Sequence, residues 1–222
     1  IRTPMGGGRG YGTTHSQSLE KMFLGTPGIK VVAGSPVLDP GTLLRNAVEH
    51  DPNPVLFLEN KLLYPERVRQ VSDGWMGEFR CRTTAGLYPT TILNPTGEDE
   101  RDVTVICYGR TALMAMEASL EVLLDTETVA EVVVVSLLSP ISLDGISDIA
   151  NRSQRVLVVE EGTLEAGWGA EVLARLVEEG FHGRARRIGA MACPIPSSRP
   201  LEDFVLPSTK SVRTAIEGLM LA

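Results

Sequence analysis

The chain is poor in the residues and runs that mark several large classes of protein. Its 222 residues include only three cysteines, Cys81, Cys107 and Cys193. They lie far apart, form no CxxC pair and are odd in number, so neither a zinc cluster nor a disulfide framework is expected. No apolar run approaches the roughly 18 residues that span a bilayer, and the amino terminus lacks the apolar block of a signal peptide. We therefore expect a soluble protein of a reducing compartment that has no membrane partner.

The chain also has no excess of positive charge. It carries 21 Lys and Arg against 28 Asp and Glu, a formal net charge of -7, whereas nucleic-acid affinity rests on cations that neutralise phosphates. No nucleic-acid partner is expected. Because the sequence begins at Ile1 and enters a glycine-rich loop at once, we expect a truncated or processed chain. We predict a cytoplasmic location, or the mitochondrial matrix if a leader was removed.

The first part of the chain alternates strand and helix signals. Residues 29–33 and 55–58 are short apolar runs typical of strands. Between them, Asp39 and Pro40 predict a helix that begins with an N-cap and a proline at its first position. We expect this strand–helix–strand unit to lie within a first domain of residues 1–67.

The middle of the chain loses this periodicity. From about residue 66 to 101 polar residues, glycine and proline are mixed, and we interpret residues 68–101 as an interdomain connector. It is long for an ordinary loop, so residues 78–82 are expected to add a strand or hairpin.

Residues 102–222 are predicted to form an α/β domain. Strands are expected at 103–107, 132–137 and 156–159. Apolar stripes at helical spacing predict helices that carry Leu113, Met116, Leu120, Leu123 and Leu124; Val172, Leu173, Leu176 and Val177; and Val212, Ala215, Ile216 and Leu219. Short turns between alternating strands and helices indicate a mainly parallel sheet with helices on both faces.

The run GGGRGYGTTHSQ at residues 6–17 is the most unusual stretch. Such glycine density permits left-handed backbone and close approach to a ligand. Neither GxGxxG nor the GK[ST] ending of a P-loop is present, so nucleotide binding is not indicated. His15 lies where this loop is expected to turn into a helix over residues 16–20, and an imidazole can donate, accept or carry a proton near neutral pH. From these residues alone, a functional loop and a flexible loop with a solvated histidine both remain open.

Three segments resemble, in order and spacing, the beta subunits of pyruvate, branched-chain 2-oxoacid and acetoin dehydrogenases. They are GYGTTHSQSLE, PGIKVVAGSPVLDPGTLLRNAVEHDPNPVLFLENKLLYP and VLVVEEGTLEAGWGAEVLARLVEE, and ACPIPSSRPLEDFVLPSTKSVRTAI resembles that family's closing segment. The resemblance covers nearly the whole chain except about residues 68–100. It implies part of a pyrimidine-binding domain of the transketolase type, followed by a carboxyl-terminal domain of the transketolase type.

The resemblance implies an enzyme that decarboxylates a 2-oxoacid on thiamine diphosphate and passes the acyl group to a lipoyl acyltransferase partner. His15 occupies the family's HSQ position, for which proton transfer and stabilisation of the intermediate are implied. The family's cofactor-protonating glutamate lies upstream of this loop, and an alpha subunit or fused alpha domain holds the diphosphate and magnesium. No residue of this chain is therefore expected to be a cofactor ligand, and the isolated chain is expected to be inactive.

A potassium site is also implied, at a helix carboxyl end whose matching positions here are Ala47, Val48, Asp51 and Asn53. An ordinary capped helix end is the alternative. Glu160 and Glu161 follow a predicted parallel strand, where α/β sheets commonly place ligands. The family's carboxyl-terminal domain serves self-association and acyltransferase docking, so we assign the two acids a cap or interface role. Trp168 is expected in a subunit contact or in the core.

Two other functions remain open at this point. The chain can be a noncatalytic dimerisation and partner-docking domain, or a fragment of another transketolase-like enzyme. The sequence does not specify whether the substrate is pyruvate, a branched-chain 2-oxoacid or acetoin.

Overall fold

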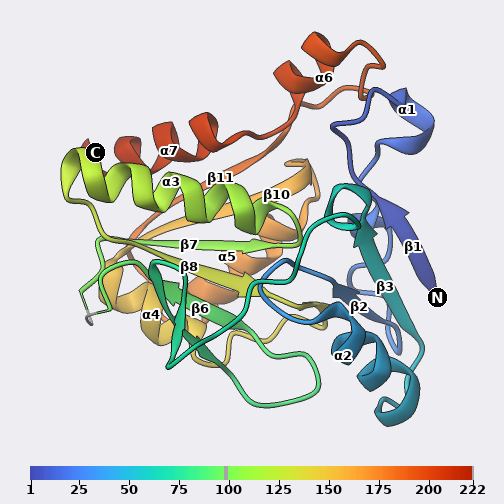
Figure 1. Ribbon diagram of the computed structural model, residues 1–222, viewed down its shortest axis with the longest axis horizontal. Coiled ribbons are helices and arrows are strands. Elements are labelled where there is room, and N and C mark those ends of the chain that lie inside the picture. Colours follow the sequence, from blue (N-terminus) through green and yellow to red (C-terminus); the bar gives the residue numbers. More distant parts are fainter. Residues whose placement is uncertain (98–99, 222) are drawn as a thin grey trace.

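The computed structural model describes residues 1–97 and 100–221, so two residues of the expected connector and the last residue of the chain lie outside the described residues. It contains a four-stranded sheet, which we call the first sheet, and a seven-stranded sheet, the second sheet (Figure 1). The first sheet is built mainly from the amino-terminal part of the chain. Among the described residues, no helix combines the length and the apolar character needed to cross a bilayer.

The first sheet has the strand order β1-β3-β2-β9. Its strands are β1 (Arg2–Met5), β3 (Val55–Asn60), β2 (Lys30–Ala33) and β9 (Leu137–Ser139). The first three run parallel, and β9 joins antiparallel to β2. Because β9 comes from the carboxyl-terminal half, the two halves of the chain share this sheet.

The expected strand–helix–strand unit is present as β2, α2 (Pro40–Arg45) and β3. The carboxylate of Asp39 accepts hydrogen bonds from the backbone N–H groups of Gly41 and Thr42, at 3.1 and 2.9 Å. These bonds satisfy donors that the first helical turn cannot pair internally, so the predicted N-cap is confirmed. The helix continues as a wider turn, η2 (Asn46–His50).

The second sheet has the order β11-β10-β7-β8-β6-β5-β4. Four parallel strands come first: β11 (Arg184–Ala190), β10 (Arg155–Thr163), β7 (Val103–Tyr108) and β8 (Ala130–Val135). Three antiparallel strands follow: β6 (Thr91–Asn94), β5 (Phe79–Thr83) and β4 (Trp75–Met76). The mainly parallel α/β architecture is thus observed.

The segment expected to be a connector is more ordered than its composition indicates. The expected strand at 78–82 is present as β5, and β6 pairs with β8 of the second sheet. All four residues of β6 are buried, and Ile92 and Leu93 extend the apolar layers on the two faces of the sheet. The segment therefore contributes three strands to the second sheet, while the division of the chain at residues 67 and 101 stays a prediction.

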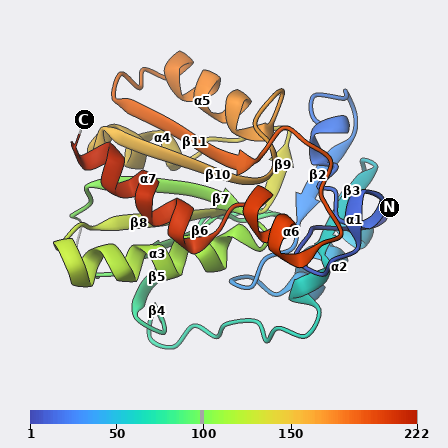
Figure 2. The ribbon, with the colours of Figure 1, turned by 90° about the horizontal axis from the view of Figure 1, so that it is seen from above.

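Helices cover both faces of the second sheet, as predicted (Figure 2). Helices α3 (Thr111–Thr126) and α7 (Thr209–Leu221) lie on one face, and α4 (Ile146–Ser153) and α5 (Trp168–Glu178) lie on the other. Along β7, Val105 and Cys107 face the first pair and Ile106 and Tyr108 the second. Continuous apolar runs are typical of strands buried on both sides.

The buried face of α3 differs from the predicted leucine stripe. Leu124 is 83 % exposed, whereas Ala112, Ala115 and Ser119 are completely buried. Small side chains let the helix axis lie close to the sheet, and the Ser119 hydroxyl donates to the carbonyl of Ala130 at 2.6 Å. Val177 of α5 is also exposed, contrary to prediction, but all four residues predicted for the α7 stripe are buried. Trp168 lies in the core, where it contacts Tyr108 edge to face at 5.1 Å between ring centroids.

Candidate functional site

The glycine-rich loop leaves β1 and lies against the carboxyl-terminal part of the chain. It is closed at its base, where the N–H of Gly6 donates to the carbonyl of Gln17 at 3.3 Å. It contains the short helix α1 (Gly12–His15), and α6 (Arg199–Val205) lies beside it (Figure 1). Segments far apart in sequence therefore meet at this loop.

The helix expected over residues 16–20 is not formed. Helix α1 ends at His15, Ser16 is its C-cap, and the next element is a single turn, η1 (Glu20–Met22). Ser16, Ser18 and Glu20 are buried, while the residues between them are partly exposed. This alternation is the period of an extended segment, not of a helix.

Two glutamates bind the backbone amides of the loop. The carboxylate of Glu202 accepts from the N–H groups of Gly8 and Gly10, at 2.8 and 2.7 Å, and Glu161 accepts from Gly7 at 2.8 Å. Gly8 and Gly10 have φ angles of +88° and +71°, which only glycine adopts without strain. Backbone with such conformations can form a concave set of N–H groups that binds an anion. Here the anion is the protein's own Glu202.

The electrostatics of Glu202 agree with this contact. The residue is fully buried. Burial alone would raise the pKa of Glu202, but the hydrogen bonds from Gly10 and Gly8 hold it below its usual range. Hydrogen bonds to the charged form favour ionisation, so this carboxylate is a stable anion inside the fold.

His15 is exposed at the end of α1. Its backbone carbonyl accepts a hydrogen bond from the ammonium of Lys61, in η3 (Lys61–Leu63). The same ammonium and the guanidinium of Arg9 lie against the ring of Tyr11, at 5.5 and 5.2 Å from its centroid. The histidine is thus presented to solvent from a fixed backbone with two cations close by, a suitable setting for exchanging a proton with an anionic ligand.

Glu160 and Glu161, at the end of β10, have separate partners. Glu160 accepts from the N–H of Gly169 at 3.3 Å, and therefore caps the start of α5. Burial raises the pKa of Glu160 to about 7. The hydrogen bond from Gly169 N–H lowers this pKa in part, whereas the negative charge of nearby Glu20 raises it further. Burial also raises the pKa of Glu161 and of Glu20. Three buried acids thus lie where the second sheet meets the loop.

The expected potassium ligands are differently engaged. Asp51 Oδ2 accepts from Lys30 at 2.8 Å and from the Tyr88 hydroxyl at 3.0 Å, while Oδ1 accepts from the backbone and side-chain nitrogens of Asn53, both at 3.0 Å. Burial opposes ionisation, but the bond from Lys30 and those from Asn53 and Tyr88 lower the pKa of Asp51 to about 2. Each oxygen of this carboxylate thus already has two donors, and the potassium site at Ala47, Val48, Asp51 and Asn53 stays a prediction. Ala47 and Val48 lie in η2, beside this cluster.

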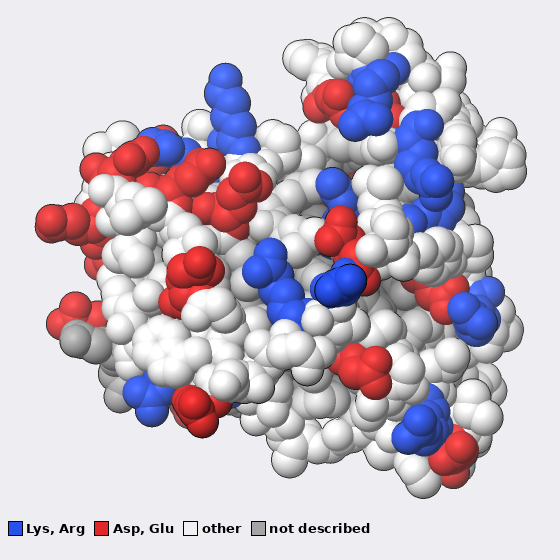
Figure 3. Space-filling model, viewed as in Figure 1, with Lys and Arg blue, Asp and Glu red and all other residues white. Residues whose placement is uncertain are grey.

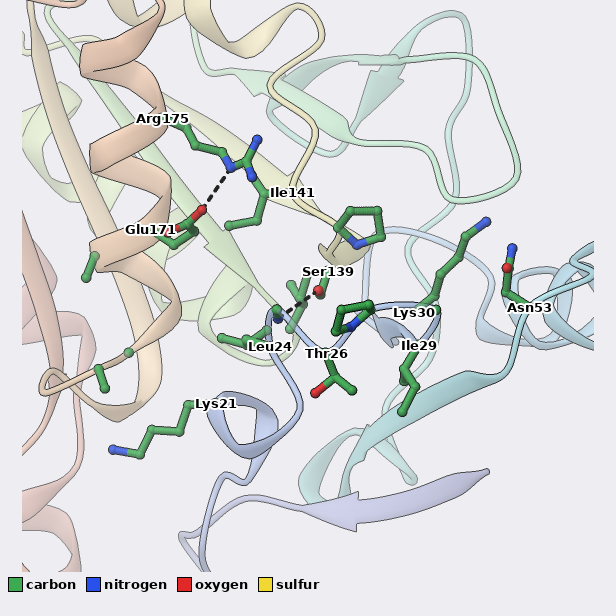
Figure 4. A pocket seen from close by; sticks show the side chains of 18 residues that line it. Lys21, Leu24, Thr26, Ile29, Lys30, Asn53, Ser139, Ile141, Glu171 and Arg175 are labelled. Carbon is green, nitrogen blue, oxygen red and sulfur yellow. Dashed lines mark hydrogen bonds and ion pairs between the residues drawn. The ribbon is translucent and has the colours of Figure 1, made fainter.

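Two of the cavities formed by the described residues are considered for the site region. One of about 710 Å³ lies between the loop before β2, β9 and α5 (Figure 4). Its cations already have partners: Lys21 donates to Thr163, Lys30 to Asp51 and Arg175 to Glu171. The other, of about 610 Å³, lies on the glycine-rich loop and is lined by Gly7, Gly8, Arg110 and Glu161 among others.

No metal site is evident in the part of the chain that the structure describes. Among those residues, no group of three or more His, Cys, Asp or Glu side chains could hold a metal ion.

Comparison with known proteins supports the resemblance seen in the sequence. The model of the family "Transketolase, C-terminal domain" matches residues 95–212. The pyruvate dehydrogenase E1 component subunit beta of Saccharomyces cerevisiae mitochondria is 29% identical, over 99% of this chain and 58% of the relative. The corresponding subunit of Porphyra purpurea is 31% identical, over 99% and 63%. The acetoin:2,6-dichlorophenolindophenol oxidoreductase subunit beta of Cupriavidus necator is 31% identical, over 99% and 62%.

The chain therefore spans about six tenths of the length of these relatives. Among solved structures, a split-gene transketolase described as an inactive beta4 tetramer aligns with 100% of this chain and 66% of its own, at a TM-score of 0.68 and 18% identity. A transketolase from Pichia stipitis aligns with 95% of this chain and 28% of its own, at a TM-score of 0.61 and 14% identity. These structures support the fold. Because the family model covers more than half of the chain, the chain belongs to the transketolase carboxyl-terminal domain family.

Proposed function

We propose that this chain is the carboxyl-terminal part of the beta subunit of a thiamine-diphosphate-dependent 2-oxoacid dehydrogenase. The complete enzyme would decarboxylate a 2-oxoacid and pass the acyl group to a lipoyl partner. The observation that carries the proposal is the glycine-rich loop, which presents His15 to solvent from a backbone bound by Lys61, Glu161 and Glu202. The likeness to beta subunits over nearly the whole chain supports the same reaction.

His15 is the proposed catalytic residue. Thiamine diphosphate, when bound, supplies the carbanion chemistry, and the protein supplies orientation and proton transfer. The imidazole nitrogens of His15 would hold or deliver a proton at the reacting carbon or oxygen. Basic side chains gather around α1 and α6 in Figure 3, whereas acidic ones gather over α3 and α7 at the opposite end. A positive surface at the loop favours the approach of an anionic 2-oxoacid.

The proposal includes partners that complete the site. We propose an alpha subunit or fused alpha domain that holds the diphosphate and its magnesium, and self-association through the carboxyl-terminal domain. The isolated chain would then be inactive. A cytoplasmic location is proposed, with the mitochondrial matrix as the alternative, since the names of several relatives include the word mitochondrial.

A noncatalytic docking function is the second candidate, and one observation favours it. Helix α6 exposes Leu201 and Phe204, at 55% and 72%, on a protein whose other large apolar side chains are mostly buried. Exposed apolar side chains that lie close together commonly mark interaction surfaces. Under this proposal the loop would be a structural support for α6 and His15 would have no chemical role.

The two candidates differ in the effect of a single substitution. The full-length protein, coexpressed with its alpha partner, is assayed for 2-oxoacid-dependent reduction of an artificial electron acceptor with thiamine diphosphate and magnesium present. His15→Ala is expected to lower kcat at least about 100-fold, in line with general acid–base contributions, while the exposed His182 serves as the matched control, His182→Ala. Undiminished turnover by His15→Ala would refute the catalytic proposal.

A further inference from the structure

We infer that Glu202 is a positioning residue for His15: its carboxylate clamps the glycine-rich loop and thereby fixes the backbone from which the histidine projects. The inference rests on the proposed function for its catalytic consequence. The clamp itself can be measured without any turnover. Nothing in the resemblance assigns a role to this residue.

The clamp has two arms on one carboxylate. One oxygen accepts from Gly8 N–H at 2.8 Å and the other from Gly10 N–H at 2.7 Å. Hydrogen bonds to an ionised acceptor are short and about twice as strong as neutral ones. Glu202 has no exposed surface, so water does not compete for either oxygen. The amides are therefore occupied, and the loop is a clamped structural element, not an open phosphate cradle.

The base of the clamp is itself fixed. In the first turn of helix α6, the N–H of Glu202 donates to the carbonyl of Ser198 at 2.8 Å. At the carboxyl end of α6, the carbonyl of Val205 accepts from the N–H of Met191, in the segment after β11, at 2.9 Å. On the loop side, the Thr13 hydroxyl donates to the carbonyl of Ile195 at 3.4 Å. The loop and the segment 195–206 thus form one packed unit.

A second set of contacts, which we call the second route, connects the amino end of the loop with the backbone of His15. Glu161 accepts from Gly7 N–H and from the Asn60 amide, both at 2.8 Å. Asn60 in turn accepts from Leu62 N–H at 3.0 Å, in the turn whose Lys61 binds the carbonyl of His15. The amino end of the loop is thus held by two acids, and its carboxyl end by one cation.

The physical consequence is preorganisation. Catalytic groups that are held in place avoid an entropy cost at the moment of reaction, and small displacements can cost up to about 100-fold in rate. Loss of the Glu202 clamp would free the Gly8 and Gly10 amides and let α1 move. The expected signature is a fall in kcat with little change in KM, because His15 would still be present but no longer fixed.

Glu202→Gln is the sharpest variant because it is isosteric but keeps only one acceptor oxygen. Its NH₂ group would face one of the two backbone N–H donors, so one arm is lost. Asp203→Asn is the matched control, since Asp203 is the next residue, has an exposed side chain and pairs only with Arg199 among the described ion pairs.

The full-length protein with its alpha partner is studied by hydrogen–deuterium exchange and by steady-state kinetics. For Glu202→Gln we expect at least about tenfold faster exchange in peptides that cover residues 6–17, unchanged exchange in β7 and β8, and a 10- to 100-fold lower kcat with KM within about threefold. Asp203→Asn should change neither. Unchanged loop exchange in Glu202→Gln would overturn the clamp. Faster exchange with unchanged kcat would overturn its positioning role.

If Glu202→Gln fails to fold, the wild type still tests the clamp, because rapid exchange of the Gly8 and Gly10 amides in the wild type would overturn it. A second pair of variants tests the contacts of Glu161. Glu161→Gln places two amide NH₂ groups against each other at Asn60, and adding Asn60→Asp restores a donor–acceptor pair. We expect the single variant to speed loop exchange and the double variant to recover at least half of the protection. Absence of recovery would overturn the second route. A wild type with a protected loop but no 2-oxoacid turnover would keep the clamp and refute the proposed function instead.

Discussion

The two sheets are stabilised in different ways. The second sheet is covered on both faces by helices, with extensive apolar clusters on each side. The first sheet shares one of those clusters through Val31, Leu56 and Leu58, but its other face has only a small cluster of four buried residues: Val32, Leu43, Val55 and Phe57. The second sheet thus has a large apolar cluster on both faces, whereas the first sheet has one only on the face that it shares with the second.

Polar contacts compensate for the smaller core of the first sheet. The ion pair of Lys30 and Asp51 recruits Tyr88, from the loop before β6 of the second sheet, and Asn46 donates to the carbonyl of Leu87 at 2.8 Å. The glycine-rich loop is likewise bound by acids of the carboxyl-terminal half. In this fold polar contacts hold the amino-terminal part against the carboxyl-terminal half, in addition to the apolar cluster that the two sheets share.

The largest expected effect is the loss of stability on truncating a core side chain, which should differ between the two sheets. Leu176→Ala deletes a fully buried side chain in the cluster that both sheets share, and should lower the free energy of unfolding by about 2–5 kcal/mol. Leu43→Ala, in the small cluster with partly buried neighbours, should cost about 2 kcal/mol, the lower end of that range.

Urea unfolding and hydrogen–deuterium exchange measure both effects. We expect Leu43→Ala to speed exchange in β2 and β3 while β7 and β10 stay protected. Equal loss of protection in both sheets would contradict the comparison, because it would make the molecule a single cooperative core.

The buried acids should make stability depend on pH. The folded pKa of Glu160, about 7, lies above its unfolded value, so between about pH 4.5 and 7 the folded state retains a proton that the unfolded state releases. Stability should therefore fall as pH rises through this window, by roughly 1–3 kcal/mol for this group.

Glu160→Gln should remove that part of the pH dependence. The glutamine still has an oxygen for Gly169 N–H, but it does not ionise. The stability of the variant relative to the wild type should therefore increase as pH rises from 5 to 8. Glu178→Gln, on the exposed side of the same helix α5, is the control. If thermal unfolding shows the same slope for wild type and Glu160→Gln, burial at this position is not the cause.

Removing the ammonium of Lys30 tests the polar cluster of the first sheet. Lys30→Met leaves the buried Asp51 without its cation, and because Lys30 is 25% exposed we expect a cost of about 1–2 kcal/mol, below the range for fully buried pairs. Lys210→Met, at an exposed position of α7, is the control. In the wild type, exchanging NaCl for KCl at constant ionic strength should leave the unfolding temperature unchanged. A saturable stabilisation by potassium would show that the ion binds despite the occupied carboxylate.

The smallest effect is expected for the exposed ion pairs of helix α7, which covers the second sheet. Arg213 of α7 pairs with Glu121, Asp125 and Glu217, all partly or largely exposed. Arg213→Ala should cost about 0.5–1 kcal/mol and less at high salt. A loss larger than that of Lys30→Met would reverse the proposed contrast between the two regions.

Local patterns predicted the elements that depend on local physics. The N-cap at Asp39 and the stripe of α7 both follow from spacing within a single segment. The predictions failed where burial is set by distant partners. Ser16 and Ser18 are buried, and Leu124 lies exposed in the last turn of α3.

The candidate site was predictable only in part. The histidine loop could be recognised from its glycine density and its HSQ residues, but its clamp could not. Glu202 is separated from Gly8 by 194 residues, and the sequence of its own segment, RPLEDFVLP, indicates only a short helix. Only information about contacts between distant positions of the chain could have predicted the pairing of Glu202 with Gly8.

The short strand β9 limits how this molecule can be divided. It is encoded after β8 of the second sheet, yet it pairs with β2 of the first. A cut at residue 101 would therefore leave β2 with an unpaired edge in one fragment and strand β9 without its sheet in the other. Open strand edges promote association with other chains, so fragments separated there should aggregate. The two parts are therefore best expressed as a single chain.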